Sequence, residues 1–98
     1  MTMLEIFKSR LPKGLEIIKT KGRYQKTEVI LKYGEVTHLL MLHKMCIPGD
    51  ENYLCDIEIC NVMMAIAMKK KDNDMFKTWL KRQQALIFVH HKSESRTD

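Results

Sequence analysis

The chain has 98 residues, of which 45% are hydrophobic and 30% charged, with 17 Lys and Arg against 12 Asp and Glu. This length fits one domain, the apolar content is too high for a disordered chain, and three cysteines do not make a disulfide scaffold. A transmembrane segment is not expected, because no run of about 18 uncharged apolar residues is present. Residues 1–11 lack the apolar stretch of a signal peptide, so we expect a cytoplasmic protein.

The formal net charge of +5 is unevenly distributed along the chain. Residues 1–33 carry eight basic and three acidic side chains, residues 34–68 one basic and five acidic, and residues 69–98 eight basic and four acidic. Two interpretations follow: the acidic centre pairs with the basic ends, or both ends form a surface that binds a polyanion. Pairing of the acidic centre with the basic ends is favoured, because a net charge is more often explained by solubility than by a specific partner.

A short amphipathic helix is predicted over 2–11, where apolar side chains recur at helical spacing before Pro12. The segments 15–21 and 27–33 are short and rich in β-branched residues, which predicts a β-hairpin. Residues 36–46 fit either a third strand, reached through a tight turn, or a helix. Because Leu and Met favour helix over strand, we predict a helix there.

Two helices are predicted in the second half of the chain. Asp50 is a good N-cap for a helix over 51–71, which is apolar nearly all round and must be covered on most sides. A second helix over 75–86 has an apolar arc and a basic opposite side. The sequence leaves two possibilities for residues 85–90: either a strand follows, or the helix continues and Phe88 is exposed to a partner.

The predicted fold is therefore α+β and helix-rich. It consists of a short N-terminal helix, a β-hairpin or small meander over 15–33, and a C-terminal helical hairpin, with an all-α fold as the alternative. We expect one compact domain over 1–92 and a disordered tail over 93–98.

No metal site, cofactor, catalytic residue or small-molecule substrate is predicted. A zinc site needs ligand pairs that converge on one ion, whereas Cys55 and Cys60 are five residues apart, as are His38 and His43. We expect the cysteines to behave as small buried apolar residues. His43 and Cys46 would touch on a helix, but no third group completes a catalytic arrangement, so the protein is predicted not to be an enzyme.

The segment Glu58-Ile59-Cys60-Asn61-Val62 resembles the E-x-x-D helix of small all-helical nucleotide pyrophosphohydrolases. That family holds magnesium between this helix and an upstream E-x-x-E helix. Here no E-x-x-E is present and Asn61 stands at the Asp position. The resemblance implies, as one alternative, a degenerate relative that lacks the metal ligands.

Asp56 lies on the apolar side of the helix predicted over 51–71. A carboxylate there needs a partner or acquires a raised pKa. The favoured interpretations are an ion pair with a basic residue such as Arg10 or Arg23, or a solvent-facing position near a frayed helix start. The alternatives are a general acid and a docking contact.

Nucleic-acid binding is the second alternative function. Tyr24 and Tyr33 offer rings that stack on unpaired bases, and basic residues form a C-terminal strip. The helix–strands–helix order resembles double-stranded-RNA-binding modules, although residues 50–53 are acidic where those modules carry a basic helix start. The strip predicted to contact nucleic acid consists of Lys69, Lys70, Lys71, Lys77, Lys81 and Arg82.

The leading prediction is a non-enzymatic protein-binding module. Eight methionines and a nearly all-apolar central helix leave more apolar surface than a chain of this size covers, which indicates a partner or a second copy. We expect a small regulator or inhibitor, of the kind that phages and viruses encode as accessory proteins, that also forms a homodimer. The predicted interface consists of Met63, Met64, Ile66, Met68, Trp79 and Phe88.

Overall fold

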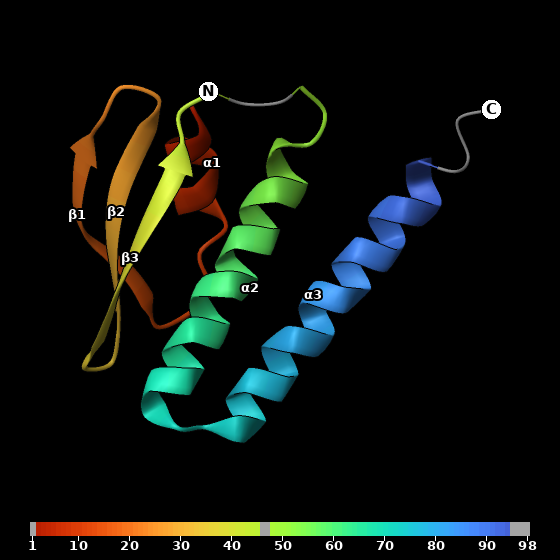
Figure 1. Cartoon of the computed structure of the whole chain (residues 1–98). Coiled ribbons are helices and arrows are strands. Elements are labelled where there is room, and N and C mark those ends of the chain that lie inside the picture. The colour runs from red at the N-terminus through yellow and green to blue at the C-terminus, as the bar shows by residue number, and fades with distance from the viewer. Residues whose placement is uncertain (1, 46–47, 95–98) are drawn as a thin grey trace.

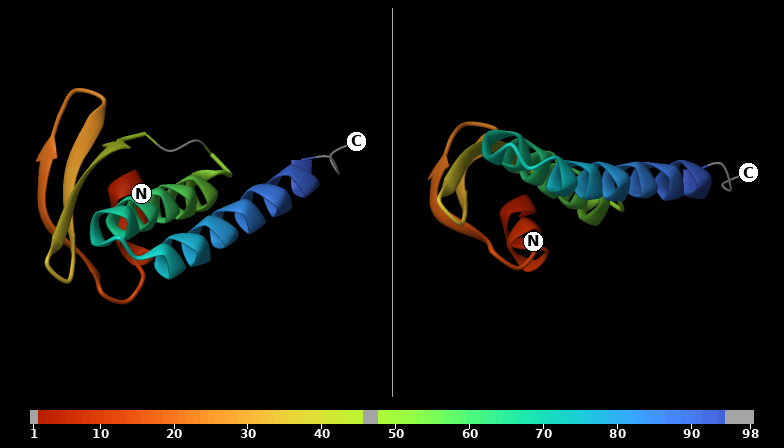
Figure 2. Two further views of the ribbon diagram at one scale, coloured as in Figure 1. Left: turned by 60° about the horizontal axis from the view of Figure 1, so that its bottom comes forward. Right: turned by 90° about the horizontal axis from the view of Figure 1, so that it is seen from below.

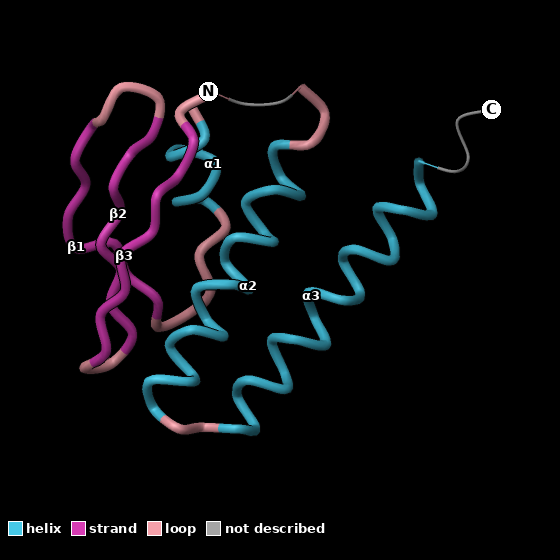
Figure 3. Tube along the Cα trace, viewed as in Figure 1, coloured by secondary structure: helices cyan, strands magenta, loops and turns pink. Residues whose placement is uncertain are grey.

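The computed structural model describes residues 2–45 and 48–94 of the chain. Along these residues the elements are, in order, α1 (Met3–Ser9), β1 (Leu15–Gly22), β2 (Lys26–Tyr33), β3 (Val36–His43), α2 (Glu51–Lys70) and α3 (Asn73–Glu94) (Figures 1 and 3). This is the predicted α+β, helix-rich order, with a short N-terminal helix, a small meander and a C-terminal helical hairpin. The all-α alternative is wrong.

The predicted β-hairpin is confirmed, and it forms two strands of an antiparallel sheet of order β1-β2-β3. Leu15, Val29 and Leu31 alternate with outward-facing residues and are buried in the core. A β-bulge interrupts the pairing between Ile17 and Lys19. The bulge adds a residue to β1, so that the strand keeps its core-facing side against β2 beyond this point.

The prediction of a helix over 36–46 is wrong, because residues 36–43 form strand β3, which pairs with β2 along its length. Gly34 has a φ of +61° and allows the tight turn that joins the two strands. Pairing with a neighbouring strand outweighs the helix preference of Leu and Met, because β-structure depends on cross-strand contacts more than on intrinsic propensity. His43 therefore ends a strand, and Cys46 lies outside the described residues.

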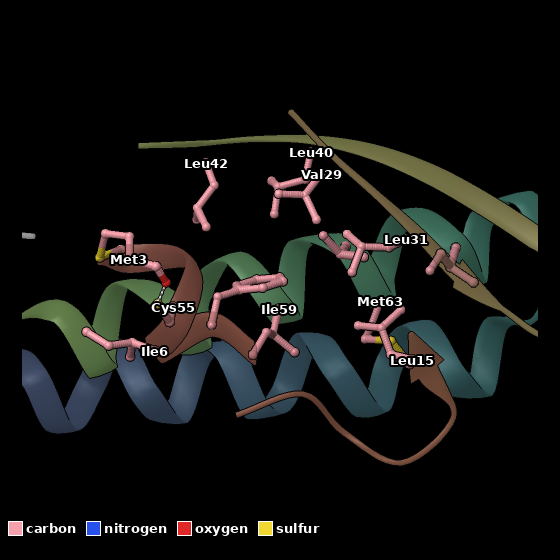
Figure 4. Packing of buried hydrophobic residues seen from close by; sticks show 13 residues of the cluster. Met3, Ile6, Leu15, Val29, Leu31, Leu40, Leu42, Cys55, Ile59 and Met63 are labelled. Carbon is pink, nitrogen blue, oxygen red and sulfur yellow. Dashed lines mark hydrogen bonds between the residues drawn. The ribbon is translucent and has the colours of Figure 1, made fainter. Parts of the chain in front are cut away.

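The core lies between the sheet and the first two helices. Helices α1 and α2 lie on one face of the sheet, and α3 runs beside α2, farther from the strands (Figures 1 and 2). Figure 4 shows side chains of β2 and β3 directed at those of α1 and α2. The largest fully buried side chains are Phe7, Leu31, Leu42, Met63, Ile66, Val29, Val62, Cys55 and Cys60.

Helix α3 runs to Glu94, which settles residues 85–90 as helix and leaves Phe88 67% exposed. The predicted disordered tail over 93–98 is therefore corrected in its first two positions, which are helical, while 95–98 lie outside the described residues. Asp72 begins α3 by accepting a hydrogen bond from the Met75 backbone N–H at 3.0 Å. Asp50 makes no such side-chain hydrogen bond at the start of α2.

Candidate functional site

The groove between α2 and α3 gathers charged and aromatic side chains from three helices. Two adjoining cavities of about 450 and 330 Å³ lie along it and share Asp56, Arg82 and Leu86 in their walls. Tyr53 lines the larger cavity, and Arg10, at the end of α1, lines the smaller one. This α2–α3 groove is the candidate site that the structure adds to the surfaces predicted from sequence.

Asp56 forms an ion pair, one of the two interpretations favoured from the sequence, and its partner is Arg10. Arg10 donates from Nε to Oδ1 and from Nη2 to Oδ2, both at 2.6 Å. Hydrogen bonding to this carboxylate raises the pKa of Arg10 above its ordinary value. Arg23, the other suggested partner, pairs instead with Glu28 at 2.6 Å.

Aromatic contacts shape the rest of the groove. The Tyr53 and His90 rings stack with their centroids 3.8 Å apart and their planes within 6° of each other. The Arg82 guanidinium lies over the Trp79 ring, 4.6 Å from its centroid. These flat, partly exposed surfaces suit an apolar or aromatic side chain, and Arg82 beside them suits a carboxylate.

The cysteines in the core behave as predicted, as small buried apolar residues: Cys55 and Cys60 are both buried. Burial raises the pKa of the Cys60 thiol, and this outweighs the opposing effect of nearby Arg82. Such a thiol stays protonated near neutral pH and is a poor nucleophile.

A third cavity, of about 760 Å³, opens between β3 and the first half of α2, and Glu58 and His43 line it. Burial raises the pKa of Glu58, and His43 opposes that shift. Asn61 points elsewhere and accepts a 2.6 Å hydrogen bond from Gln83 Nε2. The two residues that carried the pyrophosphohydrolase resemblance therefore face different surroundings.

The all-helical architecture implied by that resemblance is also contradicted, because three strands separate α1 from α2. Among residues 2–45 and 48–94, no group of three or more His, Cys, Asp or Glu side chains is placed to hold a metal ion.

The residues predicted as a protein interface do not form one surface. Met63 and Ile66 are 2% and 0% exposed, so the prediction that they belong to an interface is wrong and they are packing residues of the core. The reason is that both lie on the side of α2 that faces α1 and the sheet. Met64 and Trp79 are half-buried, and Met68 is 68% exposed.

The predicted basic strip is likewise divided. Lys69 Nζ donates a 2.8 Å hydrogen bond to the Thr37 carbonyl, and Lys70 Nζ lies 5.2 Å from the Tyr33 ring centroid, so both side chains contact the sheet. Lys71 ends α2 with a left-handed φ of 57°. The exposed residues Lys77 and Lys81 lie on α3, and Arg82 belongs to the groove.

Sequence reasoning missed an apolar patch on the outer face of the sheet, opposite α1 and α2. Leu39 and Met41 are 52% and 41% exposed there, and Ile30 is paired directly with Leu39. The alternation of exposed Leu39 and Met41 with buried Leu40 and Leu42 was a period-two signal within the segment predicted as helix.

Comparisons with protein-family models, with curated proteins and with solved structures give no match to this chain. None of the helices in the described part of the chain has the length and apolar character needed to span a membrane.

Proposed function

We propose that this chain is a small non-enzymatic regulator or inhibitor that binds an acidic, apolar segment of another protein along α3 and the α2–α3 groove. The supporting observation is at residues 87–89. Ile87, Phe88 and Val89 are 39%, 67% and 64% exposed at consecutive positions. Because successive helix residues are rotated by about 100°, these three side chains place apolar surface over about 200° of the circumference of α3 in its last third.

The charge around this apolar surface favours one kind of partner. Between residues 75 and 92 every charged side chain is basic, including Lys81, Arg82 and Lys92. A second copy docked on α3 would bring like charges together, whereas Glu and Asp of another protein would pair with them. We therefore assign α3 to an acidic partner and not to self-association.

Nucleic acid is the second candidate, and one observation favours it. Lys77, Lys81 and Phe88 lie within about 40° of each other around α3, which places two cations and a ring on one side of the helix. Against it, Lys69 and Lys70 contact the sheet, and the aliphatic side chains at 87 and 89 do not stack on bases. The protein partner is therefore preferred.

A synthetic acidic peptide can stand in for the natural partner in a test of the proposal. Fluorescence anisotropy compares a labelled amphipathic helix of Glu and Leu with its Lys and Leu counterpart, with an RNA duplex and with single-stranded DNA. We expect the acidic peptide to bind most tightly. We expect Phe88→Ala and Lys81→Glu each to weaken that binding by about tenfold or more, equivalent to about 1.4 kcal/mol.

Lys8→Glu is the matched control, because Lys8 is an exposed lysine on α1, outside both α3 and the outer sheet face. Tighter binding of duplex or single-stranded nucleic acid than of the acidic peptide at physiological salt would replace the proposal with the second candidate. Equal binding of the two peptides would refute it.

A further inference from the structure

The outer face of the sheet has an ordered pattern of charge around its apolar patch. In the central row Lys19 pairs with Ile30 and Ile30 with Leu39, across β1, β2 and β3. Leu39 is 52% exposed, and no element of the described residues packs on this side of the sheet (Figure 2). Apolar residues in this position leave a surface that water contacts unfavourably.

The rows on either side of this central row carry opposite orders of charge. On one side, Glu16 on β1 is directly opposite Lys32 on β2. On the other side, Lys21 on β1 is directly opposite Glu28 on β2, which also pairs with Arg23 at 2.6 Å. From β1 to β2 one row therefore reads negative then positive, and the other row reads positive then negative.

We propose that this outer sheet face binds a second copy of the chain, face to face, about a two-fold axis that crosses the strands at the central row. This rotation keeps each strand over its own equivalent and exchanges the two flanking rows. Glu16 then faces Lys21 of the second copy, and Lys32 faces Glu28. At the centre, Ile30 meets its equivalent and Leu39 meets its equivalent, which buries the apolar patch.

The same charges disfavour the other two-fold arrangement. An axis parallel to β2 would keep each row over itself, so Lys32 would face Lys32 and Glu28 would face Glu28 of the second copy. Like charges directly opposed are destabilising, and the pattern therefore selects one register out of two. In the selected register Lys19 is the only charged residue of these rows that meets its own equivalent, and it does so at the β1 edge, where solvent screens the repulsion.

Variants that exchange the charges of Glu16 and Lys21 test this register, with sedimentation velocity of the 98-residue chain as the measurement. We expect the wild type to dimerise, and Glu16→Lys and Lys21→Glu each to raise the dimer dissociation constant by about tenfold or more. The double variant Glu16→Lys/Lys21→Glu should dimerise nearly as well as the wild type, because each new charge faces its opposite in the second copy.

If these charges act only within the monomer, the double variant should give the opposite result. Inside one chain the double variant places Lys opposite Lys32 and Glu opposite Glu28, so it would be less stable than either single variant.

Leu39→Asp should abolish dimerisation, and circular dichroism checks that each variant folds. Lys81→Glu, on α3, should leave the dimer unchanged, which separates this proposal from partner binding. A monomeric wild type, or a double variant no better than the singles, overturns the proposal.

Discussion

Arg10 and Asp56 connect α1 to α2 through two parallel hydrogen bonds of 2.6 Å between groups 46 residues apart in the chain. Arg10 is the C-cap residue of α1, and Asp56 lies in the second turn of α2. The planar guanidinium matches both carboxylate oxygens at once, which fixes direction as well as distance. The pair therefore orients the short N-terminal helix against the helix that carries most of the core.

This pair should contribute measurably to stability. We expect Asp56→Ala to lower the free energy of unfolding by about 1–2 kcal/mol, because it leaves Arg10 without its acceptor. Arg10→Ala should cost at least as much, because it leaves the Asp56 carboxylate, whose side chain is only 22% exposed, without its donors. Urea unfolding of both variants and of the double variant should give a coupling energy of about 1 kcal/mol. Purely additive costs would show that the two side chains do not stabilise each other.

The two methionines Met63 and Met68 should respond differently to truncation. Met63 is 2% exposed in the core, so Met63→Ala should cost about 2–5 kcal/mol through lost burial and a residual cavity. Met68 is 68% exposed, so Met68→Ala should change the unfolding free energy by less than about 0.5 kcal/mol. Thermal and urea unfolding measure both. Similar small effects at the two positions would place Met63 outside the core.

The pKa of His38 should depend on Lys69. Burial and the adjacent Lys69 charge lower the pKa of His38 below its ordinary value of 6.5, and Lys69 Nζ lies 3.4 Å from His38 Nδ1. Lys69→Gln should raise the His38 pKa toward 6.5 without reaching it, because the burial remains. An NMR titration of the imidazole measures this, and an unchanged pKa would contradict the contact.

The sign of the effect on stability follows from the same shift. With a folded-state pKa below the unfolded one, the unfolded chain binds more protons in the interval between them. The His38 contribution is therefore complete above about pH 6.5 and is lost as the pH falls toward the folded-state pKa. Lys69→Gln should reduce this acid sensitivity in urea unfolding series.

Glu58→Gln should stabilise the protein at neutral pH. Burial raises the pKa of Glu58 above its ordinary value of 4.5, so this carboxyl loses its proton at a lower pH in the unfolded chain than in the folded one. Stability therefore falls as the pH rises from the unfolded-state pKa to the folded-state pKa. Removing the carboxylate should recover less than about 1 kcal/mol at pH 7, because solvent screens a half-buried group. The gain should vanish below about pH 3, where the carboxyl is protonated in both states. A stability loss at pH 7 would show that the carboxylate makes a favourable contact.

Local sequence was sufficient for most elements. The β-branched segments 15–21 and 27–33 became strands, and the 3.6-residue spacing of apolar side chains placed α1, α2 and most of α3. The ion pair of Asp56 with Arg10 was one of two that the sequence suggested, because a carboxylate on an apolar helix side requires a cation. The choice of Arg10 over Arg23 needed the packing of α1 on α2.

Other features depended on contacts between distant segments. Residues 36–43 are strand because β2 supplies a pairing partner, and an isolated segment of Leu and Met carries no information about that partner. Met63 and Ile66 became core residues only when α1 and the sheet covered their side of α2. The reversed charge rows of the outer sheet face were equally hidden, since Glu16 and Lys32 become neighbours only through strand register.

The sequence by itself therefore determined most of the helix and strand types, the α+β class and the basic, apolar character of the end of α3. Those properties arise from residues within a few positions of one another, where spacing and composition act directly. Only the tertiary structure decided which apolar and charged side chains meet solvent. The exposure of a side chain depends on which other segments pack against it. For a helix such as α2, those segments come from distant parts of the chain.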